Sequence, residues 1–570
     1  MTIIYVPTVG TPTISSAIAI ASPGDTIQVA AGTYAEHVQI NVANLTLLGA
    51  QANVDARTRP FVPANESIIT FPTPAFGTGI VNLEAPNIIF NGFTVQGNIA
   101  NSTSAIFAGD AGLFLPNTTT LDVTGLQILN SIIQNNANGI LIASIEPSPK
   151  ATNYLVSQCY FYNNSGDPGS GDGQGVFFNN SAGLLMTNIV VQNNLFNGLE
   201  TSTSVNLTYI SGAVVINNVM NQDNSIGLFG TNNTTVSNNI LYQSTGVTPL
   251  YPTNTASAFY ITNTGVGPST IYNTNLVISD NLIYEASSNG MTLSGASNVA
   301  DAIIITGNCI IANTRAGIHF AGPVSSGVTI NNNNIGQNHP GLLLDANSYT
   351  IPPLLDATNN YWNSPSGPNY NGGGPGTGDA ITDNNIPVTV SVSYTPYLTA
   401  AGVCPFSSAV TLTKTTPSIN VSPYSTIYFT VTLTVTSVPA TVTSFLDALP
   451  PLSVSQSWLI SSQSPANFFV INGYPGSQTL SLTSSLPAVL APGVYTVTIY
   501  AVTNCRDAGR FFPNTAAAIV QLNGISGFTQ NLSATAIASV ALNNRSNCCC
   551  YQAPNCCSDR RQNCCEYRRC

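Results

Sequence analysis

Two carboxylates followed by two basic groups are the side chains best suited to chemistry: Asp280, Glu285, Arg315 and His319. Carboxylates beside arginine or histidine can exchange protons with a substrate and can hydrogen-bond the hydroxyl groups of a glycan. These four residues are therefore the candidate glycan site. A structural or solvated role for the same residues is the interpretation that we favour.

A glycine-rich loop, "GDPGSGDGQG", is the candidate cation site, with Asp167 and Asp172 as possible calcium ligands. Its spacing matches neither an EF-hand nor tandem nonapeptide repeats. We therefore predict no cofactor, with calcium at this loop as the alternative.

The C-terminal tail is the most unusual segment, because it carries eight of the twelve cysteines: Cys548, Cys549, Cys550, Cys556, Cys557, Cys564, Cys565 and Cys570. Adjacent cysteines do not readily bond to each other, and so short a segment cannot build its own core. We favour disulfides to neighbouring proteins, which nearby arginines would accelerate by lowering the pKa of the thiols. An internally bridged mini-domain, a metal site and a dispensable extension are the alternatives. The tail has no histidine and no paired CxxC motifs, which argues against zinc.

The four other cysteines lie in the body of the chain. Cys404 and Cys505 are predicted to bridge the edge of a C-terminal domain. Cys159 and Cys309 each follow the leading polar residue of a repeat. We interpret them as equivalent, small buried residues of an inward stack.

Charge is scarce in this 570-residue chain: 6% of residues are charged, against about a quarter in a typical soluble protein. The formal net charge is −11, and five of the ten arginines lie in or beside the tail. A body so poor in cations excludes a phosphate-neutralising nucleic-acid surface. Weak electrostatic repulsion between copies favours a place in an assembly.

No apolar stretch reaches the roughly 18 residues of a transmembrane helix, so we expect no membrane span. The N-terminus lacks the basic and small-residue features of a secretory signal. Either the sequence is that of a mature form, or the protein reaches a cell, spore or particle surface by another route, such as release from a lysed cell.

An internal repeat dominates the first 400 residues. Five segments share a leading asparagine and a glycine nine positions later, with apolar alternation around both: they begin at Asn130, Asn218, Asn281, Asn308 and Asn332, and their glycines are Gly139, Gly227, Gly290, Gly317 and Gly341. Short strands joined by Asn and Gly bends every two dozen residues are typical of a parallel β-helix. A β-sandwich with similar turns is the alternative.

The repeat also predicts how the candidate site is arranged. Aligning Asn281 with Asn308 places Arg315 over Ser288 and His319 over Thr292. Asp280 falls on the other side of its rung, which weakens the grouping.

Both ends of the repeat resemble known proteins. The segment "ISSAIAIASPGDTIQVAAGTYAEHVQI" reads as a short amphipathic helix followed by the first strands. It resembles the start of right-handed parallel β-helix proteins of the pectate-lyase-like superfamily, in which a helix caps the open end. The segment "NNYWNSPSGP" resembles the closing segment of bacterial members, with Asn363 where glycine is usual.

The resemblance implies a fold and leaves the activity open, because the superfamily includes lyases, hydrolases, esterases, epimerases and non-catalytic adhesins. The polygalacturonase motifs "NTD", "GHG" and "RIK" are absent from the sequence, and so are the downstream esterase motifs. Three arginines and one lysine before residue 404 are a poor supply of bases for lyase chemistry.

After Cys404 the repeat stops and longer alternating strands follow, which predicts an antiparallel, Ig-like β-sandwich. It loosely resembles repeat domains of bacterial surface proteins through "FLDALP" and Trp458. The predicted organisation is thus an all-β chain: a right-handed parallel β-helix with a helical cap over residues 1–403, a β-sandwich over 404–545 and a Cys/Arg-rich tail over 546–570.

We predict a non-catalytic structural or adhesive surface protein, joined to itself or to neighbouring surface proteins by disulfides from the tail. A carbohydrate-active enzyme or glycan-binding coil is the first alternative, and a trimeric receptor-binding particle protein is the second.

Overall fold

A computed structural model of the protein describes residues 2–541, except for 60, 72–78, 98–103, 110–121, 145–151, 165–172, 181–185, 198–202, 222–224, 245–256, 263–272, 296–302, 325–326, 350–352, 386–390, 403, 405–409, 436–439, 453–455, 492 and 523–528. Contacts divide the chain into two compact units, Met1–Pro405 and Phe406–Cys570.

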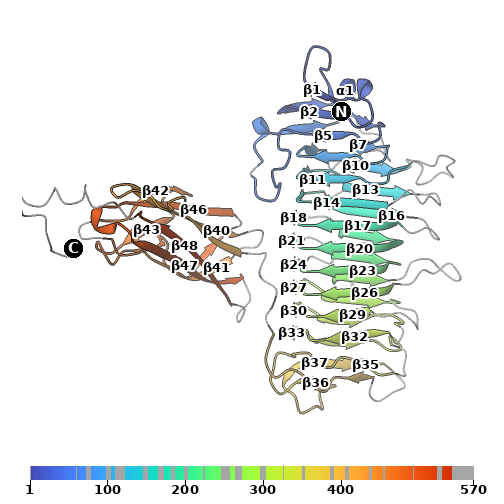
Figure 1. Ribbon diagram of the computed structural model, residues 1–570. Coiled ribbons are helices and arrows are strands. Elements are labelled where there is room, and N and C mark those ends of the chain that lie inside the picture. The colour runs from blue at the N-terminus through green and yellow to red at the C-terminus, as the bar shows by residue number, and fades with distance from the viewer. Residues whose placement is uncertain are drawn as a thin grey trace, which may run out of the picture. The chain divides into compact units, whose positions relative to one another are not determined.

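The first unit is a right-handed parallel β-helix in which each turn of the chain adds one strand to each of three long parallel sheets (Figure 1). Within the described residues, sheet A has 14 strands, in the order β1 Ile3–Val6, β2 Thr26–Val29, β5 Thr46–Leu48, β8 Ile89–Asn91, β11 Gln127–Leu129, β14 Thr152–Ser157, β17 Met186–Gln192, β20 Ile210–Ile216, β23 Asn232–Ser237, β26 Thr274–Ser279, β29 Ile303–Thr306, β32 Val328–Asn331, β35 Leu355–Asp356 and β38 Val392–Ser393.

Sheet B has 11 strands within the same residues: β3 Gly32–Ala35, β6 Ser67–Thr70, β9 Thr94–Gln96, β12 Ile132–Gln134, β15 Tyr160–Tyr162, β18 Leu195–Asn197, β21 Val219–Asn221, β24 Ile240–Tyr242, β27 Leu282–Tyr284, β30 Cys309–Ile311 and β33 Asn334–Gly336. Sheet C has 13: β4 Val38–Ile40, β7 Gly79–Leu83, β10 Ser104–Gly109, β13 Asn138–Ser144, β16 Val176–Asn180, β19 Thr203–Thr208, β22 Ser225–Phe229, β25 Ser257–Thr262, β28 Asn289–Ser294, β31 Ile318–Phe320, β34 Leu342–Leu344, β37 Gly378–Asp383 and β36 Pro368–Tyr370.

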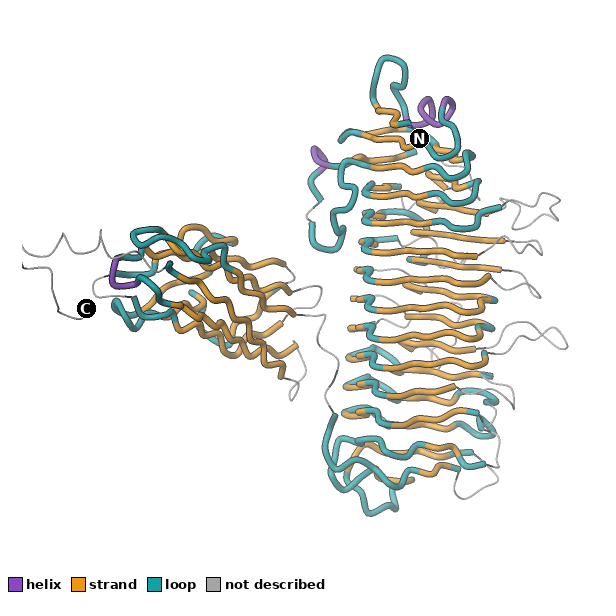
Figure 2. Tube along the Cα trace, viewed as in Figure 1, coloured by secondary structure: helices purple, strands orange, loops and turns teal. Residues whose placement is uncertain are grey.

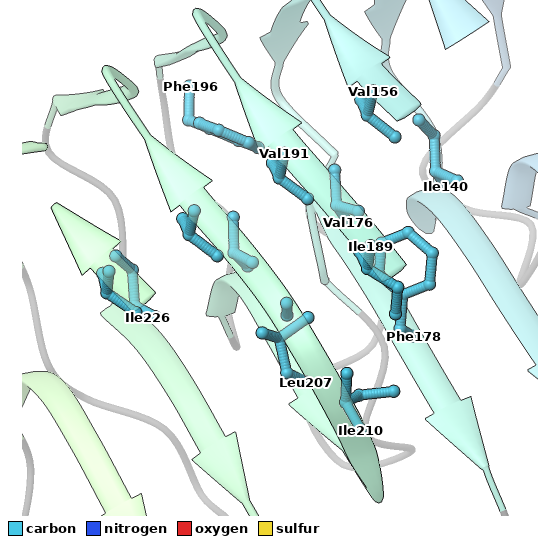
Figure 3. Packing of buried hydrophobic residues seen from close by; sticks show 14 of the residues in the cluster. Ile140, Val156, Val176, Phe178, Ile189, Val191, Phe196, Leu207, Ile210 and Ile226 are labelled. Carbon is cyan, nitrogen blue, oxygen red and sulfur yellow. The ribbon is translucent and has the colours of Figure 1, made fainter. Parts of the chain in front are cut away.

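The core of the coil consists of aliphatic and aromatic side chains stacked from rung to rung. Figure 3 shows Ile189 of β17 beside the ring of Phe178 of β16, and Val191 beside Val176 further along the same two strands. The rings of Phe161 and Phe196 stack with their centroids 4.6 Å apart. Strand residues alternate between this interior and the outer surface, as the period of two in the sequence predicts.

The predicted cap is present as helix α1, Ile14–Ile20, at the N-terminal end of the stack (Figure 2). Thr13 accepts a hydrogen bond from the Ser16 amide, and the Glu36 carboxylate accepts bonds from the Ile14 and Ser15 amides. These acceptors satisfy the first free N–H groups of the helix. The buried face of α1 covers apolar side chains that the open end of the coil would otherwise expose.

A ladder of buried asparagines runs along the turn between sheets A and B: Asn194, Asn218, Asn239, Asn281, Asn308, Asn333 and Asn360. From Asn218 onward, each side-chain oxygen accepts bonds from the side-chain and backbone nitrogens of the preceding member, as for Asn239 on Asn281 at 2.9 and 3.0 Å. Each buried amide is thereby satisfied by the next rung. The leading asparagines of the sequence repeat occupy two different positions of the rung. Some are members of the ladder, whereas Asn130 and Asn332 lie one residue before it, with φ of 49° and 58°.

The cysteine predictions for the body of the chain need correction. Cys404 is bonded to Cys309, with the two Cα atoms 5.6 Å apart, and therefore cannot pair with Cys505. Cys159 and Cys309 are not equivalent. Cys159 is a free, buried thiol in the hydrophobic core, whereas Cys309 begins β30 and lies outside that core. An outward-facing Cys309 can reach the segment that returns along sheet B after the last rung.

The second unit is a sandwich of two antiparallel sheets. The four-stranded sheet contains β39 Val410–Thr415, β40 Thr426–Val435, β46 Gly493–Val502 and β42 Leu459–Ser464. The six-stranded sheet contains β43 Phe469–Asn472, β44 Thr479–Leu482, β41 Ala440–Ala448, β47 Phe511–Leu522, β48 Thr529–Ser539 and β45 Ala488–Leu490. Within the described residues, the 3-10 helices are η1 Pro63–Asn65 and η3 Cys505–Asp507. Among the described residues, no helix has the length and apolar character needed to cross a membrane.

Candidate functional site

His319 lies in the middle of β31 and points outward from sheet C, because its neighbours Ile318 and Phe320 point into the core. Its strand partner is Thr292, as the alignment of the repeats predicted. The Nε2 atom lies 3.0 Å from an Asp345 carboxylate oxygen, and Nδ1 lies 3.3 Å from the Asn289 side-chain nitrogen. His319 is only 3% exposed, so these contacts fix its ring.

Asp345 is the accessible member of this cluster, with 42% of its side chain exposed. It follows directly after β34, at the edge of sheet C. Sequence reasoning missed both Asp345 and Asn289, because they enter through rung-to-rung register and belong to no motif. The alternation "GLLLDANS" after the last glycine of the repeat was the available signal for Asp345.

The other predicted site residues are not gathered around His319. The Arg315 amide donates to the Ser288 carbonyl at 3.1 Å, which places Arg315 over Ser288 as predicted. Glu285 follows β27 of sheet B and accepts a bond of 3.0 Å from the Gln243 side chain. Asp280 lies at the turn between sheets A and B with a φ of 56°. The predicted cluster is therefore divided between three places on the rung.

The two other arginines of the coil are held in ion pairs. Arg57 lies 2.7 Å from Asp55, and Arg59 lies 2.9 Å from Glu66. Arg59 also donates to the Asn130 carbonyl, which ties its loop to the side of the coil. Both guanidinium groups thus serve the packing of this loop.

An outward-facing row on sheet C continues from His319 along the coil, and its side chains are buried. The row passes through Asn206, Gly227, Tyr260, Thr292 and His319 on successive strands. A Cβ atom on Gly227 would lie 2.4 Å from the ring of Phe229, so the absence of a side chain there makes room for that ring.

Two aromatic rings belong to this part of sheet C: Tyr260 is a member of the row, and Phe229 lies on the same strand as Gly227. The centroids of Phe229 and Tyr260 are 6.0 Å apart. Aromatic faces beside hydrogen-bonding groups can pack on the apolar face of a sugar ring and bind its hydroxyl groups. Both rings are only 8% exposed, so Asp345 is the side chain of this region that a glycan could reach.

The remaining predicted sites cannot be placed. Asp167, Asp172 and all eight tail cysteines lie outside the described residues. In the part of the chain that the structure describes, no three His, Cys, Asp or Glu side chains gather closely enough to hold a metal ion.

Comparisons with known proteins give structural matches alone. No family model matches the chain, and no curated protein matches it. DFA-IIIase from Arthrobacter chlorophenolicus A6 in complex with DFA-III is 11% identical with a TM-score of 0.24, covering 69% of this chain and 91% of that chain. A tailspike of Acinetobacter baumannii bacteriophage AP22 in complex with capsular saccharide is 9% identical with a TM-score of 0.24, covering 84% of this chain and 68% of that chain.

The full-length major pilin SpaD from Corynebacterium diphtheriae is 11% identical with a TM-score of 0.18. The match covers 22% of this chain and only 34% of the pilin. At these levels of similarity, the comparisons assign no activity to the chain.

Proposed function

We propose that the protein is a non-catalytic structural component of a cell, spore or particle surface. It packs against neighbouring proteins through its coil and is joined to them through its C-terminal cysteines. The observation that carries this proposal is an apolar row on the outer face of sheet A, which we call the sheet A stripe: Leu155, Val190, Val214, Val277 and Ile304.

The sheet A stripe faces outward, because the residues on either side of each member point into the core. Its members are half-buried, and Ile304 is 37% exposed. Only Thr235 interrupts the row between Val214 and Val277. Apolar side chains aligned over several rungs, on strands without charged residues, favour contact with a neighbouring molecule.

The coil also suits a durable structural role. The asparagine ladder satisfies buried amides over consecutive rungs, and the Cys309–Cys404 bond ties the end of the coil to sheet B. Asn334 adds two hydrogen bonds of 2.8 Å to Gly402 in the same returning segment. These features resist fraying at the end where the stack stops.

The test compares three full-length proteins on reducing and non-reducing gels after oxidation or isolation from the native particle. They are the native chain, a variant with all eight tail cysteines replaced by serine, and Cys159→Ser as the matched control. We expect high-mass species that collapse with reductant in the native chain and the control, and monomers in the tail variant. Monomers in all three proteins would contradict cross-linking through the tail.

The exposed Asp345 carboxylate beside His319 supports a second candidate function, the binding of a glycan. The variant Asp345→Asn should weaken glycan binding at least tenfold on an array followed by calorimetry. Thr235→Ala, on the outer face of sheet A, is the control and should bind as the native chain does. Equal binding by both variants would exclude this surface. A discrete trimer in light scattering would instead favour a receptor-binding particle protein.

A further inference from the structure

Three polar side chains lie close together in the interior of the sandwich: Lys414 on β39, Asp447 on β41 and Asn514 on β47. Relative exposures are 7% for Lys414, 0% for Asp447 and 1% for Asn514. The chain has only two lysines, and this one is placed where a charge is most costly. Burial of a lysine inside the sandwich therefore needs an explanation in terms of the groups around it.

Lys414 spans the interior from one sheet to the other. β39 belongs to the four-stranded sheet and β41 to the six-stranded sheet. The Lys414 Nζ atom lies 2.5 Å from an Asp447 carboxylate oxygen, and both side chains are completely buried. The ring of Phe429 covers the amine, with its centroid 5.4 Å from Nζ.

Asn514 lies beside this pair. Asp447 is opposite Ala516 on β47, and Asn514 is the next inward residue along the same strand. It is therefore the diagonal neighbour of Asp447, at a Cα separation of about 7–8 Å that long side chains can bridge. β39, which carries Lys414, also packs against β47.

The side-chain amide of Asn514 is buried without a hydrogen bond. Neither its oxygen nor its nitrogen has a partner, and the second oxygen of Asp447 also has none. A buried amide with both groups unsatisfied is rare in native proteins, because each lost bond destabilises the fold. If the Asn514 side chain instead formed an amide bond with a neighbouring amine, its unsatisfied NH₂ group would be lost.

Burial shifts both members of the charged pair toward the protonation states that such a reaction needs. Desolvation lowers the pKa of Lys414 to about 8 and raises the pKa of Asp447. An uncharged amine is a nucleophile, and a protonated carboxyl group can donate its proton to a leaving group.

We propose that Lys414 and Asn514 become joined by an amide bond inside the sandwich, with Asp447 transferring the protons. The Lys414 Nζ atom attacks the Asn514 Cγ atom and forms a C–N bond. Asp447 takes a proton from the attacking amine and delivers one to the departing NH₂ group. The bond between Cγ and Nδ2 breaks, and one ammonia molecule leaves. Reactants and products balance without an oxidant, a reductant or a cofactor.

The bond would connect the first strand of the sandwich to its next-to-last described strand, and one sheet to the other. Strands so joined could not separate when the termini of the unit are pulled apart. This inference does not depend on the proposed function, because the bond forms within one molecule and needs neither the tail nor a neighbour.

The test is mass spectrometry of the full-length protein, reduced, alkylated and denatured. We expect a mass lower than that of the sequence by one ammonia molecule, and a branched peptide that joins the segments around Lys414 and Asn514. The variants Lys414→Met, Asn514→Ala and Asp447→Asn should each have the mass of their sequence. Lys150→Arg replaces the other lysine and should retain the loss of ammonia.

The native protein alone can overturn the proposal, so variants that misfold do not prevent a decision. An unbranched peptide with intact Lys414 would refute the bond. Loss of water with a branch at Asp447 would refute the role of Asn514. A branched peptide of full yield in Asp447→Asn would refute proton transfer by Asp447.

Discussion

At the scale of single residues, the coil is specified by buried amides. Asn281 is completely buried, and its side chain donates to Asn308 and to the Val236 carbonyl while accepting two bonds from Asn239. Asparagine suits this position because one short side chain offers both a donor and an acceptor. Aspartate lacks the donor, and an aliphatic residue would leave the groups of two adjacent rungs without partners.

We therefore expect Asn281→Ala to lower the free energy of unfolding of the coil by about 2–4 kcal/mol, since several buried groups lose their partners. Calorimetry of the coil transition measures the effect. Asn275→Gly is the matched control, because Asn275 is an exposed asparagine with a φ of 49° that bonds Asn233 at 2.6 Å. Its loss should cost less than about 1 kcal/mol. Similar losses in both variants would argue against a special role of the ladder.

Lys414 gives a prediction about pH in the Asn514→Ala variant, where no cross-link can form. Its pKa is lowered by burial from 10.5 to about 8. Between these values the unfolded chain holds the proton and the folded chain does not, so stability rises with pH. From pH 8 to 10 the free energy of unfolding of the sandwich should increase by about 2 kcal/mol.

Denaturant titrations at several pH values check this slope. The double variant Lys414→Met with Asn514→Ala should lack it, because it has no amine in the sandwich. The native chain should also lack the slope if Lys414 is held in an amide bond. A rising slope in the double variant would show that another group is responsible.

At the scale of elements, glycines allow adjacent rungs of sheet C to approach closely. A Cβ atom on Gly290 would lie 2.7 Å from the Gly317 carbonyl oxygen, and one on Gly317 would lie 2.7 Å from that of Gly341. None of these three has a positive φ. The glycine of the repeat is therefore required by contact between rungs and not by a left-handed backbone.

The Cys309–Cys404 bond stabilises the C-terminal end of the coil, and it closes a loop of 95 residues in sequence separation. We expect Cys404→Ser to lower the free energy of unfolding of the coil by about 2–4 kcal/mol, because a disulfide restricts the unfolded chain. Reductant should produce a similar shift of the calorimetric transition in the native chain and none in the variant.

Cys159→Ser is the control for that experiment. Its thiol lies 3.4 Å from the Ser157 carbonyl and takes part in no disulfide. This variant should keep the full sensitivity to reductant. If it lost that sensitivity, the stabilisation would have to be assigned to a different pair of cysteines.

At the scale of the whole molecule, a low charge and the sheet A stripe point to association. We expect Ile304→Lys to reduce self-association or co-assembly at least tenfold in sedimentation measurements, since a charge on the stripe would have to be desolvated in the contact. Thr382→Lys, on the outer face of sheet C, is the control. Equal association of both variants would exclude the stripe as a contact.

The sequence by itself determined the coil, its helical cap and the sandwich. Each rung contacts only its neighbours, so a local repeat of strand and bend is enough to specify the stack. It also placed His319 over Thr292 and Arg315 over Ser288, since equal spacing after the leading asparagine preserves register. The alignment of Cys159 with Cys309 was wrong by one residue, because it equated Gln158, which lies at the bend, with Asn308, which belongs to the ladder.

Tertiary structure alone decided which distant side chains meet. The pairing of Cys309 with Cys404 depends on the path of the chain after the last rung, which no repeat encodes. Asp345 meets His319 across adjacent rungs, and Lys414 meets Asp447 between two sheets. The physical reason is the same in each case: such contacts are set by packing between elements far apart in sequence, whereas periodicity fixes only which face of each element is buried.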